Sequence, residues 1–146
     1  PLSGVVAFAG SRHGSPYPVA PVVVSVLAAG GSIRVGCARG VDQCVRSAAP
    51  AAVVVSASAP QFANLPPRAA LARRTIHTIS GASALCLFPP ASGVLGSGST
   101  IALNTALNLF LPIWCAGTPP TPTNWQPHTL AGVSGYLWQP TQTSLF

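Results

Sequence analysis

The chain has 146 residues, of which 49% are hydrophobic, and a formal net charge of +6. This length suits a single domain with its own core, and the apolar content is far above that of disordered chains. No apolar run reaches the roughly 20 residues that a membrane-spanning helix needs, and residues 1–3 carry no basic region followed by a signal-peptide core. We therefore expect a soluble, cytoplasmic protein with no membrane partner.

The charged residues are few and nearly all of one sign. The chain has no lysine, and Asp42 is its one acidic side chain. The positive charge fits an anionic partner such as a phosphate or a nucleic acid, although a GC-rich genome would give a similar composition. A surface with so few charges is poorly protected against association, so we also expect a homo-oligomer. The arginines are spread over the first half of the chain, at Arg12, Arg34, Arg39, Arg46, Arg68, Arg73 and Arg74.

Strand-like and helix-like segments alternate along the chain. This alternation predicts a three-layer, Rossmann-like α/β fold, in which a parallel sheet of about five strands has helices on both faces. The expected strands are 5–9, 32–36, 51–56, 84–88 and 112–116. The expected helices are 22–29, 43–49, 67–79 and 100–110.

The composition changes after Gly117. Residues 118–127 are rich in proline and threonine, which is typical of a linker or a surface arm, and residues 135–139 could add one edge strand. We therefore divide the chain into a Rossmann-like domain, 1–117, and a C-terminal arm, 118–146.

Glycine-bearing loops follow three of the predicted strands. They are 10–12 after the first strand, 36–42 after the second and 93–100 after the fourth. Loops at the carboxyl ends of parallel strands share one edge of the sheet, where ligands bind. Glycine lets the backbone approach an anion, helix-starting N–H groups point at it, and arginine adds charge-assisted hydrogen bonds. The sequence therefore predicts one phosphate site at this edge, although each loop taken alone also fits a tight turn.

Two common nucleotide-binding motifs and a metal site are not predicted. Neither the GxGxxG fingerprint nor the GxxxxGK[ST] P-loop occurs, and a chain without lysine cannot form the latter. The four cysteines form no CxxC pair and lie at no zinc-ligand spacing from a histidine. Cys86 and Cys115 lie in apolar strand-like runs, so we expect reduced, structural thiols and no metal.

Four segments occur in the order seen in a known family. Gly10-Ser11-Arg12, then residues 36–42 (GCARGVD), then Arg73-Arg74 before Ile76, and then residues 96–100 (GSGST) resemble the motifs of the DNA-processing protein A (DprA) family. The likeness covers roughly residues 4–117, and the second motif is the most specific. The wider group is the SLOG superfamily of Rossmann-like proteins.

The resemblance implies binding of a nucleotide, a nucleotide-derived phosphate ligand or single-stranded DNA. By analogy with the family motifs, and with Asp42 added from its place in the second loop, the binding residues are Gly10, Ser11, Arg12, Arg39, Gly40, Asp42, Arg74, Gly96, Ser97, Gly98, Ser99 and Thr100. A bound nucleotide is the only cofactor that we consider.

No residue is assigned a catalytic role. SLOG phosphoribohydrolases carry a glutamate after their glycine-rich motif, whereas residues 98–104 here contain no acid. One carboxylate cannot form an acid–base pair, so we favour binding over hydrolysis. Two alternatives stay open, a single-stranded DNA-binding protein and a structural subunit of a homo-oligomeric assembly or filament; an enzyme acting on a nucleotide is a further possibility.

Individual residues also have plainer interpretations. Asp42 fits a helix N-cap, or it orients Arg39 or a ligand hydroxyl. Arg73 and Arg74 face different ways on a helix, and we favour Arg74 as the one at the site. His13 could contact a phosphate, and Trp114 is expected in the core.

Overall fold

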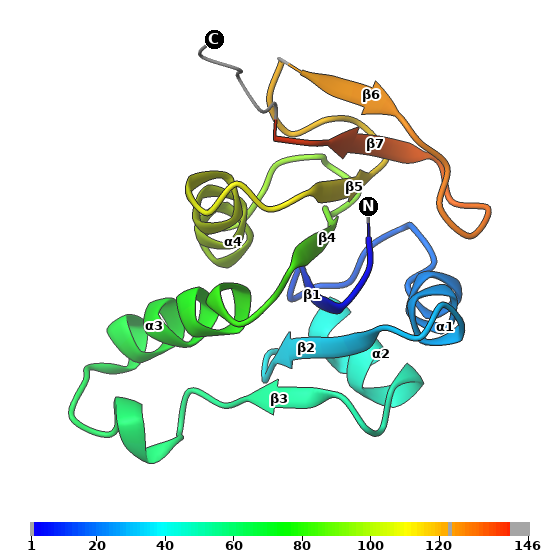
Figure 1. Ribbon diagram of the computed structural model, residues 1–146. Helices are drawn as coiled ribbons and strands as arrows, with labels where there is room; N and C mark the ends of the chain where they lie inside the picture. The colour runs from blue at the N-terminus through cyan, green and yellow to red at the C-terminus, as the bar shows by residue number, and fades with distance from the viewer. Residues whose placement is uncertain (1, 123, 141–146) are drawn as a thin grey trace, which may run out of the picture.

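The computed structural model describes residues 2–122 and 124–140. Strands and helices alternate from the N-terminus up to the last two strands (Figure 1). The strands are β1 (Val5–Gly10), β2 (Ser32–Gly36), β3 (Val53–Val55), β4 (Ala84–Phe88), β5 (Ile113–Ala116), β6 (Trp125–Pro127) and β7 (Gly135–Trp138). The helices are α1 (Ala20–Ala28), α2 (Val41–Ala48), α3 (Pro67–Ser80) and α4 (Ser97–Asn108), with a 3₁₀ turn η1 (Pro60–Phe62) before α3.

All seven strands form one sheet in the order β3-β2-β1-β4-β5-β7-β6. Strands β1 to β5 are parallel, and β7 and β6 continue the sheet in antiparallel pairing beyond β5. The chain moves outward from β1 to β3 and then crosses back to β4 on the other side of β1. The sheet order therefore reverses between β1 and β4, and such a reversal opens a crevice at the carboxyl ends of the strands.

Helices cover both faces of the sheet, so the predicted three-layer, Rossmann-like α/β class is confirmed. Figure 1 shows α1 and α2 on one side and α3 and α4 on the other. Strand β4 is buried along its whole length and alternates between the two cores. Cys86 and Phe88 pack with the α1/α2 core, whereas Leu85 and Leu87 pack with the α3/α4 core, because successive side chains of a strand point to opposite faces.

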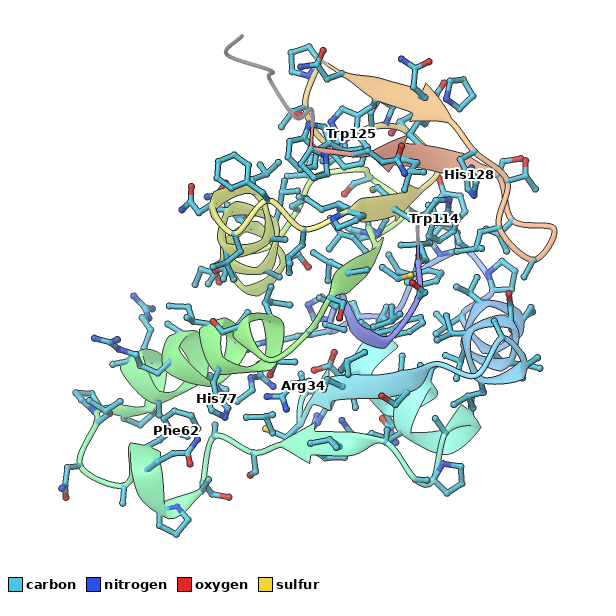
Figure 2. The ribbon with its side chains drawn as sticks, viewed as in Figure 1. Arg34, Phe62, His77, Trp114, Trp125 and His128 are labelled. Atoms are coloured by element: carbon cyan, nitrogen blue, oxygen red, sulfur yellow. The ribbon has the colours of Figure 1, made fainter. Side chains whose placement is uncertain are left out.

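Single side chains tie outlying elements to the sheet (Figure 2). Trp114 on β5 is fully buried, as expected, and its indole Nε1 donates to the carbonyl of His128 at 2.9 Å. Arg34 on β2 donates to the carbonyls of His77 and Thr78 at 3.0 Å each. These carbonyls belong to the last turn of α3, where a cation is favourable. Within the described residues, no helix is long and apolar enough to span a bilayer.

The largest differences between the structure and the expectation are at three places. The arm contributes two strands rather than one, and β6, not β7, lies at the sheet edge. Helix α4 begins at Ser97, three residues before the expected start, so part of the third glycine-bearing loop is already helical. Strand β3 has three residues rather than six, and Val53 and Val54 are exposed because it lies at the opposite edge.

Candidate functional site

One cavity of about 490 Å³ opens at the crevice between β1 and β4. Its wall contains residues of all three predicted turns, namely Gly10 to His13, Gly36 and Ala38, and Ser92 to Ser99 apart from Gly93. Helix α3 also contributes to the wall, with Arg74, Thr75, Thr78 and Ile79. We term this the rim cavity. The turns that follow β1, β2 and β4 therefore meet at one place.

The turns that follow β1 and β2 are in direct backbone contact. The N–H of Val41, at the start of α2, donates to the carbonyl of Ser11 at 3.0 Å. Gly40 precedes α2 with φ +68°, and a Cβ there would collide with the backbone of Ser11 and Arg12. Glycine at position 40 thus allows the close approach that holds Arg12 beside the second turn.

The third turn presents the start of a twelve-residue helix to the rim cavity. Gly96 is the N-cap of α4, no side chain caps this end, and its first turn holds no acidic residue. The first N–H groups of a helix have no partner inside the helix and carry partial positive charge. Ser97, Gly98 and Ser99 all line the cavity, and a Cβ on Gly98 would meet no atom within 4 Å. This end of α4 is therefore free to receive an anion.

Arg74 forms a buried cationic part of the wall. The residue is only 5% exposed, and its Nη1 lies 3.5 Å from Asp42 Oδ2 and 3.5 Å from Cys37 Sγ. Its Nε is buried without a hydrogen-bond partner among the described residues. A buried guanidinium donor without an acceptor is costly.

Asp42 supports this wall rather than capping α2, so the N-cap interpretation is wrong. Gly40 is the N-cap, and Asp42 lies inside the first turn, where its Oδ2 accepts from the N–H of Ala38 at 3.2 Å. It also pairs with Arg74, not with Arg39. Burial raises the pKa of Asp42 above its usual 3.8, and the nearby charges of Arg74, Arg46 and Arg12 oppose that rise only in part.

Nine of the twelve predicted site residues line the rim cavity, and three do not. Those in the wall are Gly10, Ser11, Arg12, Asp42, Arg74, Gly96, Ser97, Gly98 and Ser99. Arg39 is exposed outside it, and Gly40 packs against the first turn. The hydroxyl of Thr100 donates to the carbonyl of Gly96 at 2.9 Å, inside α4. Of the neighbouring arginines on α3, Arg74 is in the wall and Arg73 is exposed.

Sequence reasoning missed the contribution of α3 beyond Arg74. Thr75, Thr78 and Ile79 line the cavity. With Arg74 they lie on the buried face of α3, at positions i, i+1, i+4 and i+5, and this helical periodicity was the available signal. Both threonine hydroxyls donate to helix carbonyls, of Leu71 and Arg74. His13, which we considered as a phosphate contact, lines the cavity and is exposed.

The part of the chain that the structure describes holds no group of three or more His, Cys, Asp or Glu side chains able to bind a metal. Cys86 and Cys115 are fully buried in the sheet, as expected, and burial raises the pKa of Cys115 to about 12. Cys44 is exposed, and Cys37 is partly buried.

Comparison with known proteins gives a structural neighbour but no sequence family. No family model matches the chain, and no curated protein is similar to it in sequence. The fold is similar to DNA processing protein A from Helicobacter pylori, in a structure described as showing its unique single-stranded DNA binding mode. The TM-score is 0.60 at 19% identity, and the match covers 81% of this chain and 66% of that one. The chain thus spans just under two thirds of that neighbour, and the likeness establishes a DprA-like fold.

Proposed function

We propose that this chain binds single-stranded DNA and holds a phosphate of the strand in the rim cavity. The observation that carries the proposal is the convergence of the three glycine-bearing turns and the buried Arg74 on one cavity at the sheet reversal. A solved neighbour with this fold is described as showing a single-stranded DNA binding mode. The order of the four sequence motifs also supports a place in the DprA family and the SLOG superfamily.

The charge of the molecule supports an anionic polymer as partner. The whole chain has seven arginines and one acidic side chain. That acidic side chain, Asp42, is paired with Arg74. Arg12 is exposed at the cavity, where it can reach a phosphate without loss of an ion pair present in the described residues. Phosphate contacts supply most of the sequence-independent affinity for nucleic acid and make it sensitive to salt.

The matched pair Arg12→Ala and Arg39→Ala tests this proposal. Both remove one exposed arginine from a loop, but only Arg12 lines the cavity. In fluorescence anisotropy with a labelled oligothymidylate, we expect Arg12→Ala to weaken binding by about tenfold, as for loss of one charge-assisted hydrogen bond, and Arg39→Ala to do so only slightly. Equal losses for the two variants would show that the charge acts diffusely and that the cavity is not the site.

A free nucleotide is a second candidate, favoured by the size of the cavity. Its volume of about 490 Å³ lies within the usual range for small-molecule sites. Calorimetric titration with nucleoside monophosphates and dinucleotides would test it. Saturable heats that vanish in Gly98→Val would support this candidate, and flat titrations across the panel would reject it.

A further inference from the structure

The wall of the rim cavity runs from exposed to deeply buried residues. Arg12 and Ser97 are exposed, whereas Arg74 and Ser99 are each only 5% exposed. All four line the same cavity. A ligand that contacts both ends of this wall must therefore enter the fold rather than lie across its surface.

The buried end of the wall holds a donor without a partner. Asp42 and Cys37 occupy Nη1 of Arg74, but Nε remains buried and unpaired. The uncapped start of α4 adds backbone donors on the same wall. Together, the positive charge of Arg74 and the start of α4 favour a small anionic group that reaches into the buried part of the cavity.

An internal phosphate of a DNA strand is poorly suited to reach the buried part of the cavity. A phosphodiester has two free oxygens and one negative charge, and a nucleotide follows it on each side, so two continuations of the strand would have to leave the cavity. A terminal phosphomonoester has three free oxygens, a charge of about −1.5 to −2 at neutral pH and a single covalent link. It can approach Arg74 and the start of α4 while the rest of the strand stays outside.

We propose that the rim cavity selects the phosphorylated end of a DNA strand, a terminal phosphomonoester, over an internal phosphodiester. This inference rests on the proposed function. The terminal nucleotide fills the remaining volume, against the apolar side chains of Pro90, Val94 and Leu95. The one carboxylate in the wall, Asp42, is paired with Arg74, so it leaves Arg12 as the cation that meets the added charge.

The test uses the full chain and one short DNA sequence in four forms, which are 5′-phosphorylated, 3′-phosphorylated, hydroxyl at both ends, and circular. Each competes against a labelled oligonucleotide in fluorescence anisotropy. We expect one end-phosphorylated form to bind at least about tenfold more tightly than the hydroxyl and circular forms, as expected for one further charge-assisted hydrogen bond. Because Gly98 has open space around it, Gly98→Val should abolish this preference without unfolding the chain, whereas Arg39→Ala should keep it.

The possible failures are distinguishable. Equal affinity for all four forms overturns the end selection and leaves the proposed DNA binding intact. No binding of any form overturns the proposed function itself. Tighter binding of a nucleoside 5′-monophosphate than of any oligonucleotide form overturns the strand end as the source of the phosphate and supports the free nucleotide.

Discussion

Asp42 and Arg74 meet from helices on opposite faces of the sheet, with Oδ2 and Nη1 3.5 Å apart at the carboxyl end of β2. Asp42 is on α2, Arg74 is on α3, and both side chains pack directly over Gly36, the last residue of β2. The pair is almost fully buried, and it connects the two helical layers beside the rim cavity.

The first prediction concerns pH and the stability of the fold. Burial raises the pKa of Asp42 above 3.8, so the folded chain keeps a proton that the unfolded chain has lost. The free energy of unfolding should therefore fall as the pH rises from below 3.8 through the raised pKa, and then level off. Urea unfolding across this window should show the fall in the natural chain and not in Asp42→Asn. Because Asp42 is the only acidic side chain, parallel curves for the two proteins would contradict the prediction.

The second prediction separates backbone strain from collision at two glycines. Gly40 and Gly93 both have positive φ, +68° and +75°, but only Gly40 has backbone atoms where a Cβ would lie. Gly93→Ala should cost about 1 kcal/mol, the cost of a left-handed conformation for alanine. Gly40→Ala should cost more, about 3 kcal/mol, and should weaken DNA binding because the first turn must move. Similar losses of stability in denaturant titrations would show that the close approach to Ser11 and Arg12 is unimportant.

The third prediction grades the side chain at position 98. A Cβ here points into open space, and Gly98 lines the cavity. Replacing a helical glycine should leave the thermal midpoint unchanged or raise it slightly, since glycine is a poor helix former. Ligand affinity should fall in the order Gly98, Gly98→Ala, Gly98→Val as the cavity fills. Unaltered affinity in a folded Gly98→Val protein would place the ligand elsewhere.

The fourth prediction uses the cysteines as reporters of the core. Burial raises the pKa of Cys86 and Cys115, to about 12 for the latter, so little thiolate is available at either. In a native-state alkylation followed by peptide mass spectrometry, exposed Cys44 should react first, and Cys86 and Cys115 only after unfolding. Labelling of either at the rate of Cys44 would contradict the burial of β4 and β5.

The layered fold could be predicted because its signals are local. The continuous apolar run of β4 and the end of β2 at Gly36 fixed both strands to the residue. The edge strands were harder. Residues 118–127 are rich in proline and threonine, and β6 forms there because Trp125 buries its ring and pairs with Trp138 across the two strands. A three-residue strand is too short to show the alternation of apolar and polar residues from which such a pairing could be predicted.

The expected order of parallel strands correctly predicted that the three turns lie together at one edge of the sheet. It did not predict the roles of single residues. A helix N-cap for Asp42 is a reasonable prediction from its place before an apolar run, and the structure instead uses the carboxylate to hold Arg74. Arg39 and Gly40 belong to the most specific motif, yet neither lines the cavity. Their positions depend on how the first two turns pack, which only three-dimensional contact reveals. Self-association and ligand identity stay predictions.

Gly36 has a consequence for how this protein can change over time. The guanidinium of Arg74 and the carboxylate of Asp42 occupy the space in which any side chain at position 36 would lie. A larger residue there would expel both charges from the end of β2, so substitution at 36 is tolerable only if the arginine is shortened or lost as well. Positions 36, 42 and 74 are far apart in the chain, but they should vary together. A homologue that alters one of them should alter the others.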